Sequence, residues 1–161
     1  MILIKQRGWG NSLHEYAGDT LQGAKLGDLD LNEAELGGMD LSYADLSGTD
    51  LVLAYMYLTD LTGANLSRAN LARAHMRRAN LAGADLTRAN LRWTYMRSAN
   101  LRGANLTRAN LDEANVRNAN FTGANLSGVR LTKANLSEEQ IASAIIDDKT
   151  VLPDHLGARR K

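Results

Sequence analysis

An apolar residue recurs at every fifth position along most of the chain. The series begins at Leu21 and runs without exception to Leu136, which gives twenty-four apolar centres. Alanine stands two residues before most of these centres, as at Ala64, Ala69 and Ala74. The repeating unit is therefore five residues long, with two apolar positions and three that are mostly polar.

Neither a regular helix nor a flat strand can bury this pattern on one face. Five residues of an α-helix advance by about 500°, so successive leucines would point to every side. In a strand, every fifth residue lies on the face opposite to the previous one. A chain that turns a corner after each five-residue unit can direct both apolar residues inward. The pattern therefore predicts a coiled β structure with a core of leucine and alanine.

Several residue types recur every twenty positions instead of every five. They are the glycines 63, 83, 103 and 123, the methionines 56, 76 and 96, and the ring-bearing residues Tyr55, His75 and Tyr95 that precede these methionines. Four five-residue units therefore complete one turn of the coil. The sequence predicts about six four-sided coils, stacked at the ~4.8 Å spacing of neighbouring β-strands.

The repeat is clearest in GANLSRANLARA, residues 63–74, and SANLRGANLTRANL, residues 98–111. In these A(D/N)LXX units the chain resembles the pentapeptide repeat family, and the resemblance extends from Leu21 to about Leu136. It implies an all-β solenoid that forms a right-handed quadrilateral parallel β-helix. The family includes gyrase-binding proteins that resemble DNA in shape and charge, so the resemblance also names gyrase as a candidate partner.

A stacked solenoid exposes unpaired backbone at both ends, so capping segments are expected. The runs MILIKQ and SLHEYA flank the glycine-containing stretch RGWGN, which predicts a β-hairpin cap within residues 1–20. Ser137 and Gln140 have the spacing of a capping box, which predicts a short helix at about residues 138–146. We expect one domain, in which residues 21–136 form the β-helix and residues 137–161 form a helical cap and a flexible tail that begins at His155.

Charge is unevenly divided along the chain, although the net charge is only +1. Residues 1–60 contain ten acidic and three basic side chains, whereas residues 61–133 contain twelve basic and three acidic ones. The two parts could mark different binding surfaces, set the register of an assembly, or simply form solvated faces.

The stretch LAYMYLTDL, residues 53–61, breaks the repeat with two tyrosines. Equivalent positions of successive coils lie about 5 Å apart, so Tyr55, His75 and Tyr95 are expected to form an outward ladder. We predict an exposed surface of ten residues, which we call the aromatic–arginine wall. Its members are Leu53, Tyr55, Tyr57, Leu58, Arg73, His75, Arg77, Trp93, Tyr95 and Arg97.

Two interpretations of this wall remain open. Aromatic residues edged by arginine are enriched in protein–protein interfaces, which favours a partner-binding surface. Stacking between neighbouring coils, including a cation–π contact between Arg73 and Trp93, would also explain the pattern. A second column of Arg68, Arg88 and Arg108 suggests either an anion site or solvated side chains.

The sequence offers little for catalysis. Cysteine is absent, which excludes disulfides, thiolate metal sites and a cysteine nucleophile. His14, His75 and His155 lie in separate segments without metal-ligand spacing. The glycines follow the twenty-residue period and not a phosphate-binding loop. We therefore expect no enzyme activity, metal or cofactor. No apolar run suits a signal peptide or a membrane span, so we expect a cytoplasmic location.

The sequence favours a non-catalytic scaffold that binds another protein through the wall. One alternative is a DNA mimic that binds gyrase, but its acidic residues would be confined to the first coils. Another alternative is weak binding of nucleic acid or another polyanion, but the arginines are spread over three sides of the coil. We expect a monomer or an end-to-end dimer.

Overall fold

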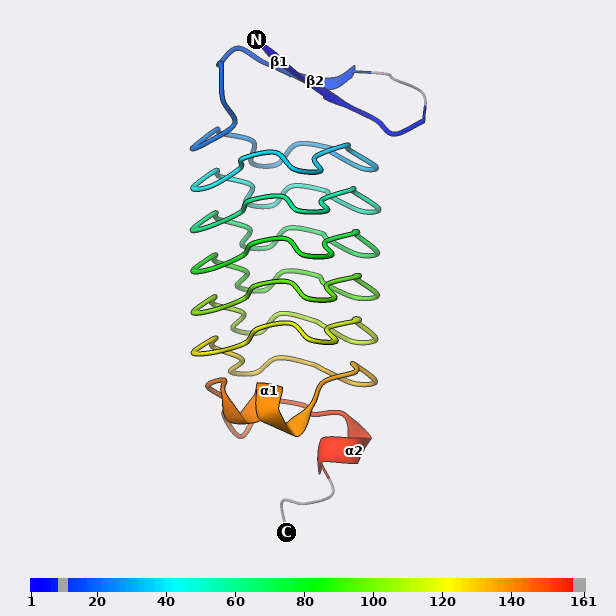
Figure 1. Ribbon diagram of the computed structural model, residues 1–161, viewed down its shortest axis with the longest axis vertical. Helices are drawn as coiled ribbons and strands as arrows, with labels where there is room; N and C mark the ends of the chain where they lie inside the picture. Colours follow the sequence, from blue (N-terminus) through cyan, green and yellow to red (C-terminus); the bar gives the residue numbers. More distant parts are fainter. Residues whose placement is uncertain (9–11, 158–161) are drawn as a thin grey trace.

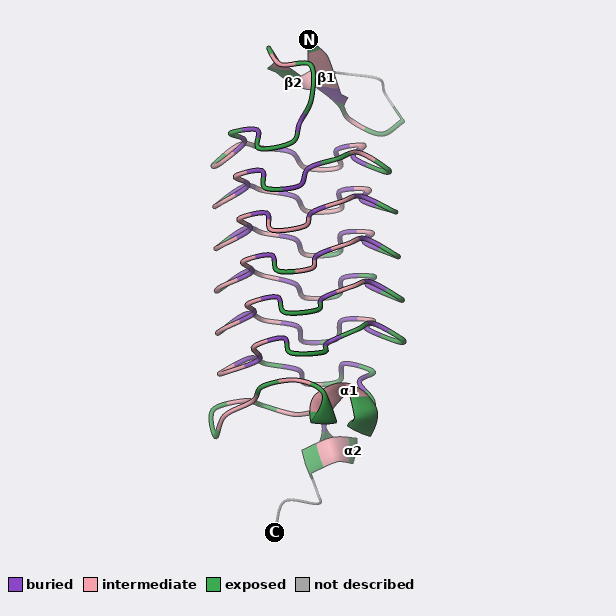
Figure 2. Cartoon of the chain, turned by 60° about the vertical axis from the view of Figure 1, so that its left-hand side comes forward, coloured by how far each residue is buried: buried purple, intermediate pink, exposed green. Residues whose placement is uncertain are grey.

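The chain forms a stack of four-sided coils (Figure 1) in the computed structural model, which describes residues 1–8 and 12–157. Parallel bridges join residues twenty positions apart, from Lys25 with Asp45 to Asn110 with Arg130. The predicted period of four five-residue units per turn is therefore confirmed. Buried and exposed residues alternate along each coil (Figure 2).

The apolar centres fill the inside of the coils. Every centre from Leu21 to Leu136 is buried, including the largest, Phe121. The alanines two residues before the centres are buried beside them. Where threonine replaces alanine, its hydroxyl finds a backbone acceptor: Thr49 and Thr59 each donate to a carbonyl of the preceding coil at 2.8 Å. The core is a continuous column of leucine and alanine.

A tight turn follows each centre. The amide of Ala64 donates to the carbonyl of Leu61 at 3.0 Å, and this bond recurs from unit to unit. The second turn residue has a positive φ, for example 60° at Arg68 and 64° at Gly63. Such a φ with a negative φ before it defines a type II turn. A residue other than glycine is strained by about 1–2 kcal/mol at this second turn position. Replacing such a residue with glycine therefore removes its side chain without disturbing the backbone.

Asparagine and aspartate side chains hold the corners together. The Asn65 Oδ1 atom accepts from the amide of Ser67 at 3.1 Å, and its Nδ2 atom donates to Asp45 in the preceding coil at 3.1 Å. Asn90 donates to Asn70 in the same way at 2.8 Å. The regular Asp and Asn residues before the centres thus serve the backbone.

The N-terminal cap is an antiparallel hairpin of strands β1, Ile2–Lys5, and β2, Ser12–Tyr16. It lies over the first coil (Figure 1), and Ile4 is fully buried. The end of β1 and the residues after it pair with the first coil: the amide of Glu35 donates to the carbonyl of Lys5 at 2.8 Å, and the amide of Arg7 donates to the carbonyl of Glu33 at 3.1 Å. The hairpin is confirmed, while Trp9, Gly10 and Asn11 of its predicted turn lie outside the described residues.

The C-terminal cap differs from the prediction in extent. Helix α1, Glu138–Ala142, starts with the predicted capping box of Ser137 and Gln140, but it ends before residue 146. It ends because the chain rejoins the β-helix, where Ile145 pairs with Asn125 and Val151 pairs with Arg130.

The expected tail is also partly structured. Helix α2, Asp154–Gly157, includes the first residues of the segment that we expected to be flexible. The ring of His155 explains this order, because its Nε2 atom lies 2.8 Å from the carbonyl oxygen of Leu136. Residues 158–161 lie outside the described part of the chain.

Candidate interaction surface

Each coil of the β-helix has four sides of five residues, which are counted in chain order, so that residues 39–43 belong to the first side. The second side consists of residues 24–28, 44–48, 64–68, 84–88 and 104–108, and the fourth side of residues 34–38, 54–58, 74–78, 94–98 and 114–118. Seven of the ten wall residues lie on the fourth side, and the other three, Leu53, Arg73 and Trp93, lie on the turns just before it.

The predicted ring ladder is present on the fourth side. The ring centroids of Tyr55 and His75 are 4.8 Å apart with an interplanar angle of 8°, and those of His75 and Tyr95 are 4.8 Å apart with an angle of 15°. The guanidinium of Arg7, from the N-terminal cap, lies 3.8 Å from the centroid of Tyr55. Ring faces inside the ladder are therefore covered by other groups, and the ring edges point outward.

A groove lies between this ladder and the next outward column of the same side. The hollow measures about 760 Å³. It is lined by Arg7, Glu35, Gly37, Gly38, Tyr55, Tyr57, Leu58, His75, Arg77 and Tyr95. We call this hollow the fourth-side groove.

Six of the ten residues that line the groove belong to the predicted wall. The other four, Arg7, Glu35, Gly37 and Gly38, were not predicted from the sequence. Glu35 and Gly37 stand twenty residues before Tyr55 and Tyr57, so the period could have found them. Arg7 could not be found this way, since it comes from the hairpin.

The other wall residues lie outside the groove. Arg97 continues the column of Tyr57 and Arg77 one coil further. On the turns before the fourth side, the predicted contact of Arg73 with Trp93 is present, with 5.4 Å between the guanidinium carbon and the ring centroid. The guanidinium carbon of Arg92 lies nearer to the same centroid, at 4.0 Å. The Nε atom of Arg92 is buried without a hydrogen-bond partner. Trp93 thus makes cation–π contacts with two arginines.

After the first coil, towards the C-terminus, the fourth side carries a net positive charge. From Tyr55 to Asn118 its residues include Arg77, Arg97 and Arg117 and no carboxylate. The ion pair of Arg7 with Glu35, 3.3 Å between Nε and Oε1, lies at the upper end of the groove. Within the described part of the chain, no arginine of the wall forms an ion pair. These guanidinium groups are therefore available to an anionic partner.

His75 makes the ladder sensitive to pH. Burial, and secondarily the nearby charge of Arg7, lowers the pKa of His75 below its ordinary value of 6.5. The folded protein then binds fewer protons than the unfolded chain near this pH. We expect the free energy of unfolding to fall as the pH is lowered from 7 to 5.

The variant His75→Asn tests this expectation, since asparagine occupies the same column at Asn115 and Asn135. Urea unfolding followed by circular dichroism should show a flatter pH dependence in this variant. Tyr95→Asn, which keeps the imidazole, should change the level of stability but retain most of the slope. Equal slopes in wild type and His75→Asn would contradict the assignment.

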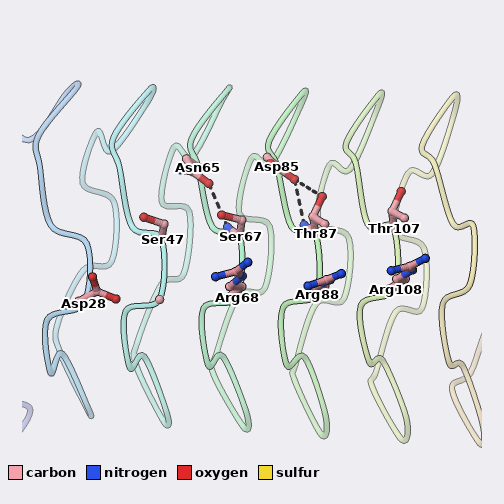
Figure 3. Close-up of a pocket in the computed structure, with 11 residues that line it drawn as sticks. Asp28, Ser47, Asn65, Ser67, Arg68, Asp85, Thr87, Arg88, Thr107 and Arg108 are labelled. Carbon is pink, nitrogen blue, oxygen red and sulfur yellow. Dashed lines mark hydrogen bonds between the residues drawn. The ribbon is translucent and has the colours of Figure 1, made fainter.

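The column of Arg68, Arg88 and Arg108 lines a second hollow, of about 680 Å³, on the second side. Figure 3 shows these arginines in a row along the stack, beside a parallel row of hydroxyl-bearing side chains. Asp28 and Asp85 line the same hollow, and Asp85 accepts hydrogen bonds from Thr87. This surface mixes both charges and carries no exposed aromatic group, so it is the weaker binding candidate.

Within residues 1–8 and 12–157, no three His, Asp or Glu side chains are grouped as a metal site would require. The same part of the chain contains no helix with the length and apolar character needed to cross a membrane.

The comparisons with known proteins point to one family. The model of the pentapeptide repeats matches residues 21–56, 59–97 and 99–137 in eight copies. A solved pentapeptide repeat protein from the thylakoid lumen of Arabidopsis thaliana is 37% identical, with a TM-score of 0.64, over 66% of this chain and 74% of that chain. No curated protein matches with significance.

Two further solved structures are similar. A pentapeptide repeat protein from Nostoc, alr5209, is 32% identical with a TM-score of 0.49, over 67% of this chain and 84% of that one. The plasmid-mediated fluoroquinolone resistance protein QnrB1 is 18% identical with a TM-score of 0.48, over 79% of this chain and 67% of that one.

Proposed function

The chain belongs to the pentapeptide repeat family of right-handed quadrilateral β-helices, and from this premise we propose that it is a non-catalytic scaffold that binds another protein through the fourth-side groove. The observation that carries the proposal is the gathering of exposed apolar groups there. Tyr57, Leu58 and Tyr95 are 43%, 51% and 50% exposed, and all three line the groove. Tyrosine and arginine at one concave site are typical of interface centres.

Stacking between coils accounts for only part of this surface. It explains Tyr55, His75 and Tyr95, whose rings contact one another. Tyr57 and Leu58 have no such explanation: Tyr57 has no ring contact within the described residues, and Leu58 is strained by its φ of 57°. Tyr57 and Leu58 are thus two exposed apolar side chains in one groove that stacking between coils does not require, which favours a role in binding.

Photo-crosslinking tests the proposal. A photoreactive phenylalanine analogue at Tyr57 should form a discrete adduct with a protein of the native host, whereas the same analogue at Thr107, on the second side, should not. Adding Leu58→Gly should abolish the adduct, because it removes an apolar side chain that lines the groove. The fold should stay intact, because glycine suits this turn. Arg88→Gly, the matched turn substitution on the second side, should leave it unchanged. Identical adducts from positions 57 and 107 would contradict the proposal.

The gyrase alternative receives less support from the geometry. The acidic residues of the first coils, such as Asp30, Asp40 and Asp45, lie on different sides and encircle the rod instead of forming one strip. Several are also engaged by their own turns. Hydrogen bonds from the side chain and the amide of Ser42 lower the pKa of Asp40, and Ser47 has the same effect on Asp45. A supercoiling assay without inhibition at micromolar protein would remove this alternative.

Location and oligomeric state stay predictions. The cytoplasm remains the proposed location. A monomer is favoured over an end-to-end dimer, because cap side chains already bond the backbone of the last coil, as Thr150 does with the carbonyl of Leu126 at 2.9 Å.

A further inference from the structure

We propose that the fourth-side groove, together with Arg97 just beyond its end, binds an extended acidic segment of the partner, with one apolar side chain near the first coil and carboxylates over Arg77 and Arg97. This inference rests on the protein-binding function proposed above. It adds the chemistry of the bound segment and the position of each of its parts.

The apolar side chain would occupy a notch at the upper end of the groove. Gly37 and Gly38 of the first coil leave open the space next to Tyr57 and Leu58, which stand at the equivalent positions of the second coil. A Cβ atom on Gly38 would meet nothing within 4 Å, and one on Gly37 would meet only backbone oxygens, at 3.5 and 4.0 Å. The notch thus offers two apolar walls and room for a side chain from outside.

The carboxylates would lie over the arginine column that continues below the notch. Arg77 and Arg97 are exposed and occupy equivalent positions of successive coils, whose spacing is the 4.8 Å seen between the stacked rings. Like charges at this spacing repel one another, and a carboxylate placed between them relieves the repulsion through charge-assisted hydrogen bonds. No carboxylate of the fourth side competes for these groups below Glu35.

The distance between the two ends defines the length of the segment. Gly37 and Arg97 are three coil steps apart, and each step is 4.8 Å, as between the stacked rings. An extended chain covers this distance with about four residues at ~3.4 Å each. Because alternate side chains of an extended chain point the same way, the segment would carry acidic residues two and four positions from its apolar residue, in either chain direction.

The ring geometry favours a peptide over a single-stranded nucleic acid. Binding of single strands relies on aromatic faces on which bases stack. In the ladder, the rings of Tyr55, His75 and Tyr95 cover one another, and Arg7 covers the outer face of Tyr55. Glu35 adds a negative charge at the upper end, which a phosphate backbone would avoid.

Fluorescence anisotropy with defined probes tests the inference on the full chain. The first probe is a fluorescein-labelled glycine–serine peptide that carries one leucine, with glutamates two and four positions after it. The second probe has the same pattern in reverse order. Control peptides replace the leucine by serine or both glutamates by lysine, and a twelve-nucleotide single-stranded DNA serves as the competing anion.

We expect at least one of the two leucine–glutamate peptides to bind, with affinity about tenfold weaker for the serine control and no detectable binding for the lysine control. Arg77→Glu combined with Arg97→Glu should weaken binding by tenfold or more. Arg88→Glu combined with Arg108→Glu makes the same change of total charge on the second side. This control pair should weaken binding by no more than twofold.

Three results would overturn the inference. They are no binding of either leucine–glutamate peptide at millimolar concentration, an equal loss in both arginine pairs, and tighter binding of the DNA than of the peptides. Failure of the proposed function is distinguishable from these. If an adduct forms at Tyr57 but the crosslinked segment lacks acidic residues, protein binding stands and the acidic segment is refuted. If the peptides bind as expected but no host protein is crosslinked, the groove chemistry stands and the scaffold function fails.

Discussion

Replacing Leu71 with alanine is expected to lower the free energy of unfolding by about 2–5 kcal/mol, in the upper half of that range. Leu71 is fully buried in a middle coil, between the equivalent residues Leu51 and Leu91. The cost depends on how far the surroundings can move into the space that the side chain leaves.

The walls around Leu71 cannot move far. Its amide donates to the carbonyl of Asn90 at 2.8 Å, and the amide of Asn70 donates to the carbonyl of Thr49 at 2.9 Å. These bonds tie the coil to both neighbours, so the backbone cannot close over a cavity without breaking them. The cavity therefore stays, and its lining loses contacts that nothing replaces.

Urea unfolding followed by circular dichroism measures this effect. Arg88→Gly is the control, because it removes an exposed side chain at a turn where glycine is favoured. Its stability should remain within about 1 kcal/mol of the wild type. Similar stability of the Leu71→Ala and Arg88→Gly variants would mean that the leucine column does not hold the coils together.

The β-helix could be predicted from the sequence because every unit obeys the same local rule. Leucine at the centre and alanine two residues before it have the sizes that a narrow core accepts, and tertiary context does not change from coil to coil. The caps obey no such rule. Ile141 and Ile146 keep the five-residue spacing, yet Ile141 lies in helix α1 while Ile146 rejoins the β-helix. The spacing alone does not distinguish these outcomes.

The candidate site was predictable where its residues repeat and hidden where they do not. The ladder follows from the twenty-residue period of Tyr55, His75 and Tyr95. The notch is formed by missing side chains at Gly37 and Gly38, and a search for unusual residues overlooks glycine. Whether the wall binds a partner depends on a second molecule, which one sequence does not contain.

Gln140→Ala is expected to lower the free energy of unfolding by about 2–4 kcal/mol, because it leaves the carbonyl of Ala119 without a donor, removes one of two donors to the carbonyl of Val116 and removes the acceptor of the Ser137 amide. The Nε2 atom of Gln140 donates to the carbonyls of Val116 and Ala119, both at 2.8 Å. Its Oε1 atom accepts from the amide of Ser137 at 2.8 Å. At the equivalent place one coil earlier, the amide of Asn120 donates to the carbonyl of Ala99 at 2.9 Å, so the side chain of Gln140 takes the place of a backbone donor that is missing at the end of the stack.

The isosteric variant Gln140→Glu separates hydrogen bonding from packing. A carboxylate at this position would face two carbonyl oxygens and could not donate to either, so its pKa should be raised. A group whose pKa is raised by folding stabilises the protein below that pKa. The variant should therefore be as unstable as Gln140→Ala at pH 7 and should recover part of the loss as the pH falls to 4 and the carboxyl group regains a donor. Urea unfolding at both pH values measures this. Glu139→Ala, an exposed neighbour, should change stability by about 0.5 kcal/mol at most. If it costs as much as Gln140→Ala, the helix as a whole, and not the glutamine amide, closes the end of the β-helix.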